Sequence, residues 1–408
     1  LCGPEVLQNI VSSVVTNRTI QLTMAMKVMD RAQKCNIPHI AGTTENNFLI
    51  HFLLYDFFSA ARYQLLLEGA VRILMLSDIS KAFDRVQLAV LLLALKTLFH
   101  GHDITRLLAA IESLYKQTRI AISQKDVATL CEKLAGVHQG DPLSAILFAL
   151  LMEFVRRLIP PTRRYKIKFY MSEGEVMVLV EIDYADDQIR VADKVADMQD
   201  LVDALKEALA KAGLQWNPKK VFLVALRYTQ RRGVHLFDPQ ITAGLDAQGS
   251  PLYLDFMKPQ AVALDWDADT SSVVGEVFKS LGVWMSWRAH ASAAGLMATS
   301  AAVVRIDRIM RSDYPFGAKL KCIQLCVTRL SEHVSFTAWI PPELLGQIDQ
   351  VEQKSMRAFL GFNIPCAVLK GPGFRLATRV WRQEIIHLTG FVRALGSPDQ
   401  RLKAAALA

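Results

Sequence analysis

Apolar residues recur along this chain at two different spacings, which predict two kinds of secondary structure. Residues 4–34 and 45–68 carry apolar side chains three and four positions apart, as amphipathic helices do. The runs 72–78 and 175–182 are short, apolar and rich in residue types that favour strands. Helices and strands are therefore expected to alternate over the first part of the chain.

Further along, two helices are predicted with defined ends. The helix that starts at Pro142 has its proline in the first turn, where a missing N–H costs nothing, and Asp141 before it is a favoured N-cap. A strongly amphipathic segment, 194–213, closes at Gly213, and glycine is the residue type that most often ends helices. From about residue 290 the pattern is helical throughout.

The segment around residues 175–191 contains a tight polar turn, so its two halves are expected to pair as an antiparallel hairpin. Antiparallel strands combined with helices predict an α+β fold. We expect a sheet with helices packed on one of its faces, followed by a helical bundle. With 408 residues, 51% of them hydrophobic, the chain is long enough for two or three packed subdomains.

Positive charge is concentrated near the C-terminus. The net charge is +8, and residues 301–408 carry 15 Lys and Arg against 8 Asp and Glu, which accounts for seven of those eight charges. Such a segment is either a solvated basic surface or a groove for a polyanion. Charge alone leaves both interpretations open.

No segment has the pattern of a leader or a membrane span. The start, LCGPEVLQNIV, lacks a basic stretch followed by an apolar block. The longest apolar run, 143–155, contains Glu153 and is too short to cross a bilayer. The six cysteines are scattered, which favours buried thiols in a reducing compartment. An intracellular protein without a signal peptide is therefore expected.

The hairpin turn carries an unusual concentration of acid. Asp186 and Asp187 are adjacent at its tip, and Asp183 lies just before them. Two neighbouring carboxylates raise each other's cost of ionisation unless a cation lies between them. Aspartate is also common in ordinary turns, because it bonds to its own backbone there. On this evidence alone, a solvated turn is the better interpretation.

A second acidic position changes that interpretation. Asp78 lies at the exit of the apolar strand 72–78 and can face the hairpin tip if the two strands pair. Three carboxylates from neighbouring strands can hold two Mg²⁺ ions, which prefer oxygen ligands. Two ions about 3.5–4 Å apart stabilise both the attacking and the leaving oxygen of a phosphoryl displacement. This arrangement predicts phosphoryl-transfer chemistry.

Several motifs occur in one order around these acids, and together they resemble the reverse transcriptases of non-LTR (LINE-type) retrotransposons. YADD by itself is a weak signal, but its combination with the others at these spacings is specific and covers most of the chain. The motifs are GTTENNFLIHFLL (42–54), DISKAFDRV (78–86), GVHQGDPLSAILF (136–148), YADD (184–187), GLQWNPKK (213–220) and FKSLGV (278–283).

The resemblance implies a right-hand polymerase fold and a reverse transcriptase activity. It implies partial fingers over 1–70 and a palm over 71–286, which together form the reverse transcriptase domain 1–286, and a helical thumb over 287–408. The expected partners are an RNA template, a DNA primer, their RNA–DNA hybrid and dNTPs, with two Mg²⁺ ions or Mn²⁺ in their place. No membrane partner is expected, the nucleus is the expected location, and the oligomeric state is left open.

The resemblance also assigns roles to individual residues. Asp78, Asp186 and Asp187 match the catalytic metal-binding trio, with the backbone carbonyl of Ile79 as a further ligand. Phe83 matches the steric gate that excludes a 2′-OH, although it could instead be a core residue. The remaining matches are nucleotide-binding Gln139, Gly140 and Lys220, and primer-grip Phe278, Lys279, Leu281 and Gly282.

Other charged residues receive less specific expectations. Asp183 and Asp84 are expected to be structural or surface residues, and Asp141 either a helix cap or a ligand. In the thumb, a set of basic residues could follow a nucleic-acid backbone. The set comprises Lys319, Lys321, Arg329, Lys354 and Arg357.

The chain also departs from the family pattern. Ala145, Ser280 and Val221 replace the usual Pro, Tyr and Thr, but none of these changes removes a catalytic group. The basic stretch of the fingers that clamps the triphosphate is not matched, so weak polymerisation by this chain is expected. Before Asp78 the chain has six basic residues: Arg18, Lys27, Arg31, Lys34, Arg62 and Arg72.

Other functions compete with this interpretation. A decayed or domesticated reverse transcriptase fold could act as a nucleic-acid-binding scaffold, but all three acids are present. A group II intron-like maturase or an RNA-templated RNA polymerase is the third candidate. The GVHQGDPLS form argues against the intron class, and Phe83 argues against RNA synthesis.

Overall fold

The computed structural model describes most of the chain in separate stretches. They are residues 4–29, 42–116, 119–124, 127–132, 135–138, 141–163, 167–170, 176–179, 181–245, 248–257, 261–262, 273–274, 277–281, 283–288, 291–328, 340 and 342–360.

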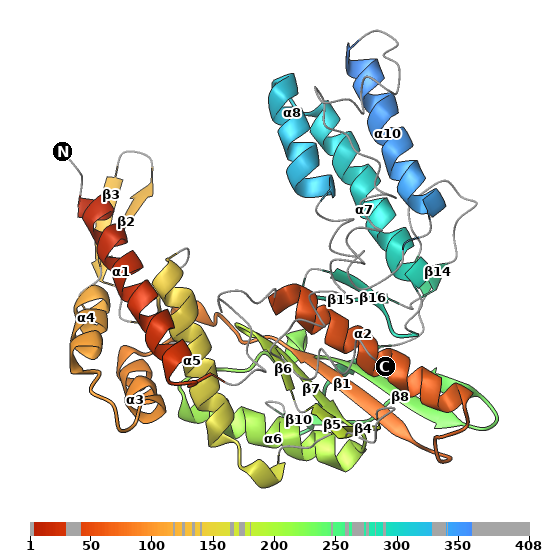
Figure 1. The fold of residues 1–408 in the computed structure, drawn as a ribbon, viewed down its shortest axis with the longest axis horizontal. Helices are drawn as coiled ribbons and strands as arrows, with labels where there is room; N and C mark the ends of the chain where they lie inside the picture. The colour runs from red at the N-terminus through yellow and green to blue at the C-terminus, as the bar shows by residue number, and fades with distance from the viewer. Residues whose placement is uncertain are drawn as a thin grey trace.

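A six-stranded sheet forms the centre of the structure (Figure 1). Its strands follow the order β12–β8–β1–β7–β6, and β9 also pairs with β8. All pairings are antiparallel except that of β12 with β8. The strands are β1 (Val71–Ser77), β6 (Glu181–Tyr184), β7 (Asp187–Ala192), β8 (Phe222–Thr229), β9 (Gly233–Leu236) and β12 (Asp255–Phe256). The α+β class and the hairpin are therefore confirmed.

Helices surround the sheet. They are α1 (Pro4–Ala25), α2 (Gly42–Arg62), α3 (Leu88–Leu98), α4 (Thr105–Tyr115), α5 (Pro142–Leu158) and α6 (Val195–Lys211), with 3-10 turns η1 (Phe83–Arg85), η2 (Pro161–Arg163) and η3 (Pro218–Lys220). α5 has the predicted bounds because Asp141 caps it, and α6 ends before Gly213, whose φ is +70°. α1 is shorter than predicted: it stops at Ala25, and Lys27 after it has a φ of +50°.

The sheet is covered on both faces, so the expectation of helices on one face is wrong. Ile73 and Met75 of β1 point into a core formed with α3, α5 and α6. Leu74 between them points into a second core, formed with α2, β16 and α7. A strand buried on both sides is apolar at every position, which explains the unbroken run in the sequence.

The other strands of the described residues form two-stranded antiparallel pairs. They are β2 (Arg119–Gln124) with β3 (Val127–Glu132), β4 (Ile167–Tyr170) with β5 (Val176–Leu179), β10 (Thr242–Leu245) with β11 (Pro251–Tyr253), β13 (Ala261–Val262) with β14 (Val273–Val274), and β15 (Val277–Ser280) with β16 (Val283–Ser286). The apolar run 175–182 is thus not one strand: β5 pairs with β4, and β6 pairs with β7.

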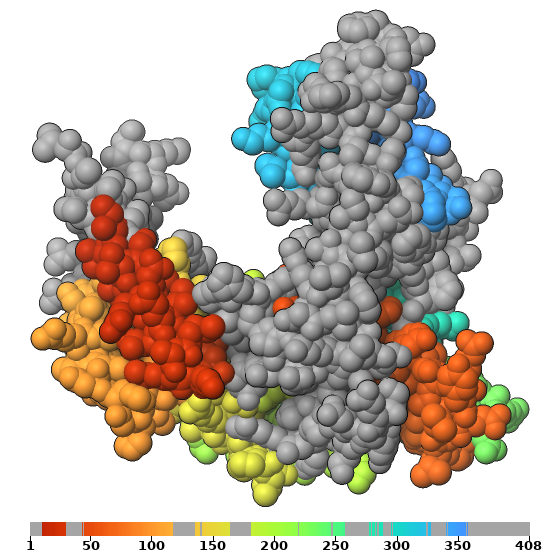
Figure 2. All heavy atoms as spheres, viewed as in Figure 1, coloured from red at the N-terminus to blue at the C-terminus, as the bar shows by residue number. Residues whose placement is uncertain are grey.

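The last described part of the chain is helical, as predicted. It contains α7 (Ala291–Arg311), α8 (Phe316–Ile323), a π-helical turn (Gln324–Thr328) and α10 (Pro342–Leu360). In Figure 1 these helices stand together above the sheet, while α1, α3 and α4 lie to its left. Figure 2 shows that the surface is hollowed between α1 and α8.

Two expectations about this helical part are wrong in detail. Lys319 is only 4% exposed and donates to the carbonyl of Met310 (2.9 Å), so it cannot follow a nucleic-acid backbone. Lys321 and Lys354 are exposed, whereas Arg329 lies outside the described residues. Cys326 is an exposed free thiol rather than a buried one.

Within the described stretches, no helix combines the length and apolar character that crossing a membrane requires.

Candidate active site

Two neighbouring strands bring the acidic residues of the sequence motifs to one edge of the sheet. β1 and β7 pair so that Ser77 lies opposite Gln188, which places Asp78 beside the start of β7. β6 and β7 are joined by a two-residue turn, Ala185 and Asp186, and Asp187 is the first residue of β7. The hairpin therefore presents Asp186 and Asp187 to Asp78, as the sequence predicted.

The three carboxylates repel one another. Partial burial, and then the charges of Asp186 and Asp78, raise the pKa of Asp187 to about 6, although more than a third of Asp187 is exposed. Burial, together with the charge of Asp78, also raises the pKa of Asp186. Lys220 opposes both shifts, and its Nζ donates to Asp78 Oδ2 (2.8 Å). The three carboxylates therefore carry more negative charge than Lys220 neutralises.

This donor set fits a hard divalent cation by its chemistry. In the described part of the chain, no three His, Cys, Asp or Glu side chains already stand in a metal-binding group. Carboxylate oxygens are nevertheless the ligands that Mg²⁺ prefers, and an added cation would relieve the repulsion that raises these pKa values.

The backbone of Ile79 is oriented to add a further oxygen. Ile79 forms an isolated antiparallel bridge with Trp216, in which the flanking bonds run from Ser80 N to Gln215 O and from Asn217 N to the carbonyl of Asp78. In such a pair, the N–H and C=O of the bridging residue point away from its partner. The carbonyl of Ile79 thus faces away from Trp216, towards the side of β1 that pairs with β7.

A pocket of about 340 Å³ adjoins the acids on the face of the sheet that carries Leu76 and Ile189. The pocket lies between the sheet and the β15–β16 hairpin. The predicted primer-grip residues Phe278 and Leu281 therefore line the same pocket as Asp78 and Asp187. Its lining is Leu76, Ser77, Asp78, Asp187, Gln188, Ile189, Lys220, Phe222, Phe278, Ser280 and Leu281. The backbone of Lys279 lies in β15, and Gly282 lies outside the described residues.

The motif at residues 136–148 packs against the motif at residues 78–86 around Phe83. Phe83 is half-buried, and its ring stacks on that of Phe148 in α5, with centroids 4.9 Å apart. Val137 N donates to the carbonyl of Phe83, and Gly136 N donates to the carbonyl of Val86. A Cβ on Gly136 would lie 2.9 Å from the backbone of Asp84, and its φ is +94°, so only glycine fits there. Gln139 and Gly140, which follow, lie outside the described residues.

Asp141 is a structural cap. Its carboxylate accepts from the backbone N–H of Leu143 (3.1 Å), from Tyr115 Oη (3.2 Å) and from Ser12 Oγ. The carboxylate therefore joins α1, α4 and α5, and the ring of Tyr115 stacks on His138 at a centroid distance of 5.3 Å. Of the two roles left open by the sequence, the helix cap is confirmed.

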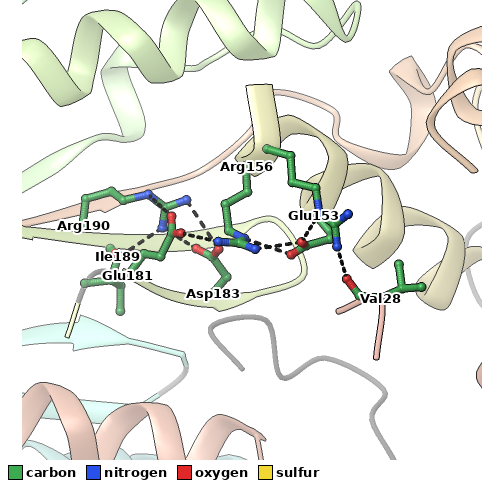
Figure 3. A network of polar contacts seen from close by, with 8 residues as sticks. Val28, Glu153, Arg156, Glu181, Asp183, Ile189 and Arg190 are labelled. Carbon is green, nitrogen blue, oxygen red and sulfur yellow. Dashed lines mark hydrogen bonds and ion pairs between the residues drawn. The ribbon is translucent and has the colours of Figure 1, made fainter. Parts of the chain in front are cut away.

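Behind the β6–β7 hairpin lies a buried ionic network (Figure 3). Arg190 pairs with Asp183 and with Glu181 (3.4 Å), both across the β6–β7 hairpin. Arg156 of α5 joins Glu181 (3.2 Å) to Glu153 (2.7 Å). Arg157 adds a further pair with Glu153 and donates to the carbonyl of Val28. Three carboxylates are thus matched by three guanidinium groups, and the expectation that Asp183 is structural is confirmed.

Residues 11–270 match the family model described as "Reverse transcriptase (RNA-dependent DNA polymerase)". The chain belongs to the reverse transcriptase family. Curated relatives include Pol polyproteins of R2 retrotransposable elements. One from Bradysia coprophila is 34% identical over 116 residues, which are 28% of this chain and 12% of that protein. One from Drosophila melanogaster is 33% identical over 92 residues, which are 22% of this chain and 8% of that protein.

The R2 matches agree with the non-LTR type that the motifs predict. The aligned parts cover at most 14% of these three relatives, so this chain corresponds to a small part of them. Solved structures with some likeness include telomerases. Apo telomerase of Candida tropicalis has a TM-score of 0.40 and 10% identity, with 98% of this chain and 61% of that chain covered. The telomerase of Candida albicans, in complex with a fragment of telomeric RNA, has a TM-score of 0.42 and 12% identity, with 97% of this chain and 53% of that chain covered.

One of the six basic residues before Asp78 is paired with carboxylates inside the protein. Arg72 is buried and donates to Asp56 (2.8 Å) and Asp193 (3.0 Å), so it cannot reach a nucleotide. Arg31 and Lys34 lie outside the described residues. Weak polymerisation, expected because the basic stretch that clamps the triphosphate is not matched, stays a prediction.

Substituting Asp187 by Asn is expected to stabilise the metal-free domain at neutral pH. Because the pKa of Asp187 is about 6 in the folded protein, above its ordinary value of about 3.9, the folded protein binds this proton more tightly than the unfolded chain does. The ionised carboxylate therefore costs stability above pH 6, and the cost vanishes below about pH 4. The variant should gain most in thermal midpoint near pH 7.5 and little near pH 4.5.

The measurement is thermal unfolding in EDTA at both pH values, with Asp84→Asn as the control. Asp84 is exposed in the η1 turn, so its variant should change little at either pH. An equal gain for Asp187→Asn at the two pH values would contradict the electrostatic explanation.

Proposed function

We propose that this reverse transcriptase domain is catalytically active and extends a primer along an RNA template with dNTPs. The observation that carries the proposal is the convergence of Asp78, Asp186 and Asp187, where partial burial and then mutual repulsion raise the pKa of the two hairpin acids. A fold that needed only stability would gain by losing such acids. Their retention at one sheet edge supports a cation-dependent role.

In this proposal, Asp78, Asp186, Asp187 and the backbone carbonyl of Ile79 would hold two divalent ions. When bound, the ions would stabilise the attacking and leaving oxygens of the nucleotidyl transfer. Lys220 lies at Asp78 with its ammonium exposed, where it can pair with the triphosphate or protonate the leaving pyrophosphate.

The pocket beside the acids suits the end of the primer. Its wall from β15 and the following turn contributes Phe278 and Leu281, and its floor contributes Leu76 and Ile189. An apolar wall next to charged groups can hold a sugar and a base while it leaves the terminal hydroxyl at the metal ligands. In this proposal, residues 1–286 form the fingers and palm, and residues 287–408 form the thumb.

The deciding experiment is primer extension on an RNA template with dNTPs and Mg²⁺, and with EDTA in parallel. Extension that depends on the metal supports the proposal. Binding of the primer–template without extension at any Mg²⁺ or Mn²⁺ concentration would contradict it and would leave a nucleic-acid-binding scaffold as the function.

Replacing Phe83 by Val is expected to let the enzyme incorporate ribonucleotides. In the proposed site, the aromatic ring lies beneath the incoming sugar and leaves no space for a 2′-OH. Discrimination by one steric contact in a pocket is worth on the order of 10- to 100-fold, so the rNTP to dNTP ratio of kcat/KM should rise by that amount. Single-nucleotide incorporation with each substrate measures it.

The matched control is Phe99→Val. Phe99 is 1% exposed in the same core, so this variant loosens packing without touching the proposed gate. If both variants change the ratio equally, or if neither does, then Phe83 is only a packing residue against Phe148.

A further inference from the structure

The strand that leads into the catalytic turn is an edge strand, and this leaves part of its backbone without a strand partner. β6 stands at the end of the sheet order and pairs with β7. Tyr184 and Asp187 close the two-residue turn, and Asp183 lies opposite Gln188 as the next pair. Because hydrogen-bonded and non-bonded pairs alternate along an antiparallel ladder, the C=O of Asp183 points outward from the hairpin.

A side chain from α2 takes the place of the missing strand. Asn46 Nδ2 donates to the carbonyl oxygen of Asp183 at 2.9 Å, and Asn46 is fully buried in the first turns of that helix. Three residues later on the same helix, Leu49 enters the core that covers this face of the sheet. The donor therefore approaches β6 from a helix that is itself fixed by packing.

Asp183 is held at both of its ends. Its carboxylate is paired with Arg190 on β7, and its carbonyl accepts from Asn46 on α2. The turn that follows is strained, because Ala185 is not glycine and yet has a φ of +55°. A residue keeps such a conformation only where the surrounding structure determines it firmly. The two bonds to Asp183 fix the backbone just before this turn.

From this geometry we infer that Asn46 is a positioning residue for the catalytic hairpin, a role that rests on the proposed function. It holds β6 at Asp183 and so fixes where the strained turn presents Asp186 to Asp78. Metal-binding carboxylates have to be placed to within a fraction of an ångström for productive geometry. Loss of this hydrogen bond should therefore affect the chemical step more than nucleotide binding.

The experiment compares Asn46→Leu with Asn47→Leu. Asn47 is the adjacent residue, is equally buried, and makes no hydrogen bond to the described residues of the hairpin. For Asn46→Leu, kcat for primer extension should fall on the order of 10- to 100-fold, the scale for a misplacement of about 1 Å, while KM for dNTP is unchanged. Asn47→Leu should leave both constants close to those of the unmodified protein.

A second measurement needs no activity. Amide hydrogen exchange of the unmodified protein and both variants is followed over residues 184–188, where exchange should become faster in Asn46→Leu only. Equal exchange in the two variants, or a kcat for Asn46→Leu equal to that of Asn47→Leu, overturns the inference. If either Leu variant does not fold by circular dichroism, Asn46→Ala and Asn47→Ala replace the pair in the same assays.

The two measurements also separate this inference from the proposed function. If the unmodified protein does not extend a primer, the proposed function fails, and the exchange comparison alone decides whether Asn46 holds the hairpin. If extension occurs and depends on Asp186, but both Asn variants behave alike, only the inference about Asn46 fails.

Discussion

Replacing Asp186 by Asn is expected to abolish primer extension while the domain keeps its fold and its affinity for RNA. Asp186 lies in the two-residue turn of the hairpin, where it is half-buried, and burial together with the charge of Asp78 raises its pKa. The amide has the same shape but cannot carry the negative charge that holds a divalent ion. Polarisation of a phosphoryl oxygen by metal is worth several kcal/mol, so kcat/KM should fall on the order of 10³-fold or more.

Primer extension and RNA binding are measured on the same preparations. The matched control is Asp84→Asn, which removes one exposed carboxylate from the η1 turn and should leave extension intact. Because removing a repelling charge does not weaken the hairpin, the thermal midpoint of Asp186→Asn should be no lower than that of the unmodified protein. Extension by this variant near the unmodified rate would refute the assignment of the acids.

The sequence predicted the catalytic edge because its signals are local. A strand that ends at Asp78, a tight acidic turn and a capped helix at Pro142 each depend on a few adjacent residues, and the structure has all three. The register that brings Asp78 beside Asp187 requires β1 to pair with β7, which the sequence left as a condition and the structure shows. The order of the motifs also predicted primer-grip residues, and two of these, Phe278 and Leu281, line the same pocket as Asp78 and Asp187.

The arrangement of layers could not be predicted in the same way. An apolar strand such as β1 does not state which helix covers which face, and α2 proved to cover the face opposite to α5 and α6. Helix α1 misleads more strongly, since Ile10 and Val14 are exposed while Thr16 and Thr19 are buried. Those buried hydroxyls donate to carbonyls four residues earlier, so polar side chains fill the inner face without an unsatisfied donor.

Asn46 and the buried ionic network were missed for a related reason. Asn46 and its partner Asp183 lie far apart in the sequence, and so do Arg156 of α5 and Glu181 of β6, which join the two halves of the network. One signal was available: Glu181 and Asp183 alternate with Ile182 along β6, so their side chains share one face. Charged residues repeated on one face of a buried strand require partners of opposite sign.

Replacing Arg190 by Met is expected to be the most destabilising substitution in the catalytic hairpin. Its side chain is 1% exposed and compensates both Asp183 and Glu181, which are themselves 3% and 4% exposed at the side chain. Methionine has a similar length but no charge, so Asp183 would be left buried without its partner. Removing one member of a buried ion pair costs about 3–5 kcal/mol, a large part of the stability of an ordinary domain.

Arg157→Met provides the matched control for this prediction. Its side chain is 43% exposed, and Glu153 keeps a second guanidinium from Arg156 when Arg157 is lost. An ion pair that is partly in solvent contributes only about 0–1 kcal/mol, so this variant should unfold at nearly the same urea concentration as the unmodified protein. Equal midpoints for the two variants would mean that the network is not the support of the hairpin. A large loss for Arg190→Met alone would show that the acids facing Asp78 depend on charges buried behind them.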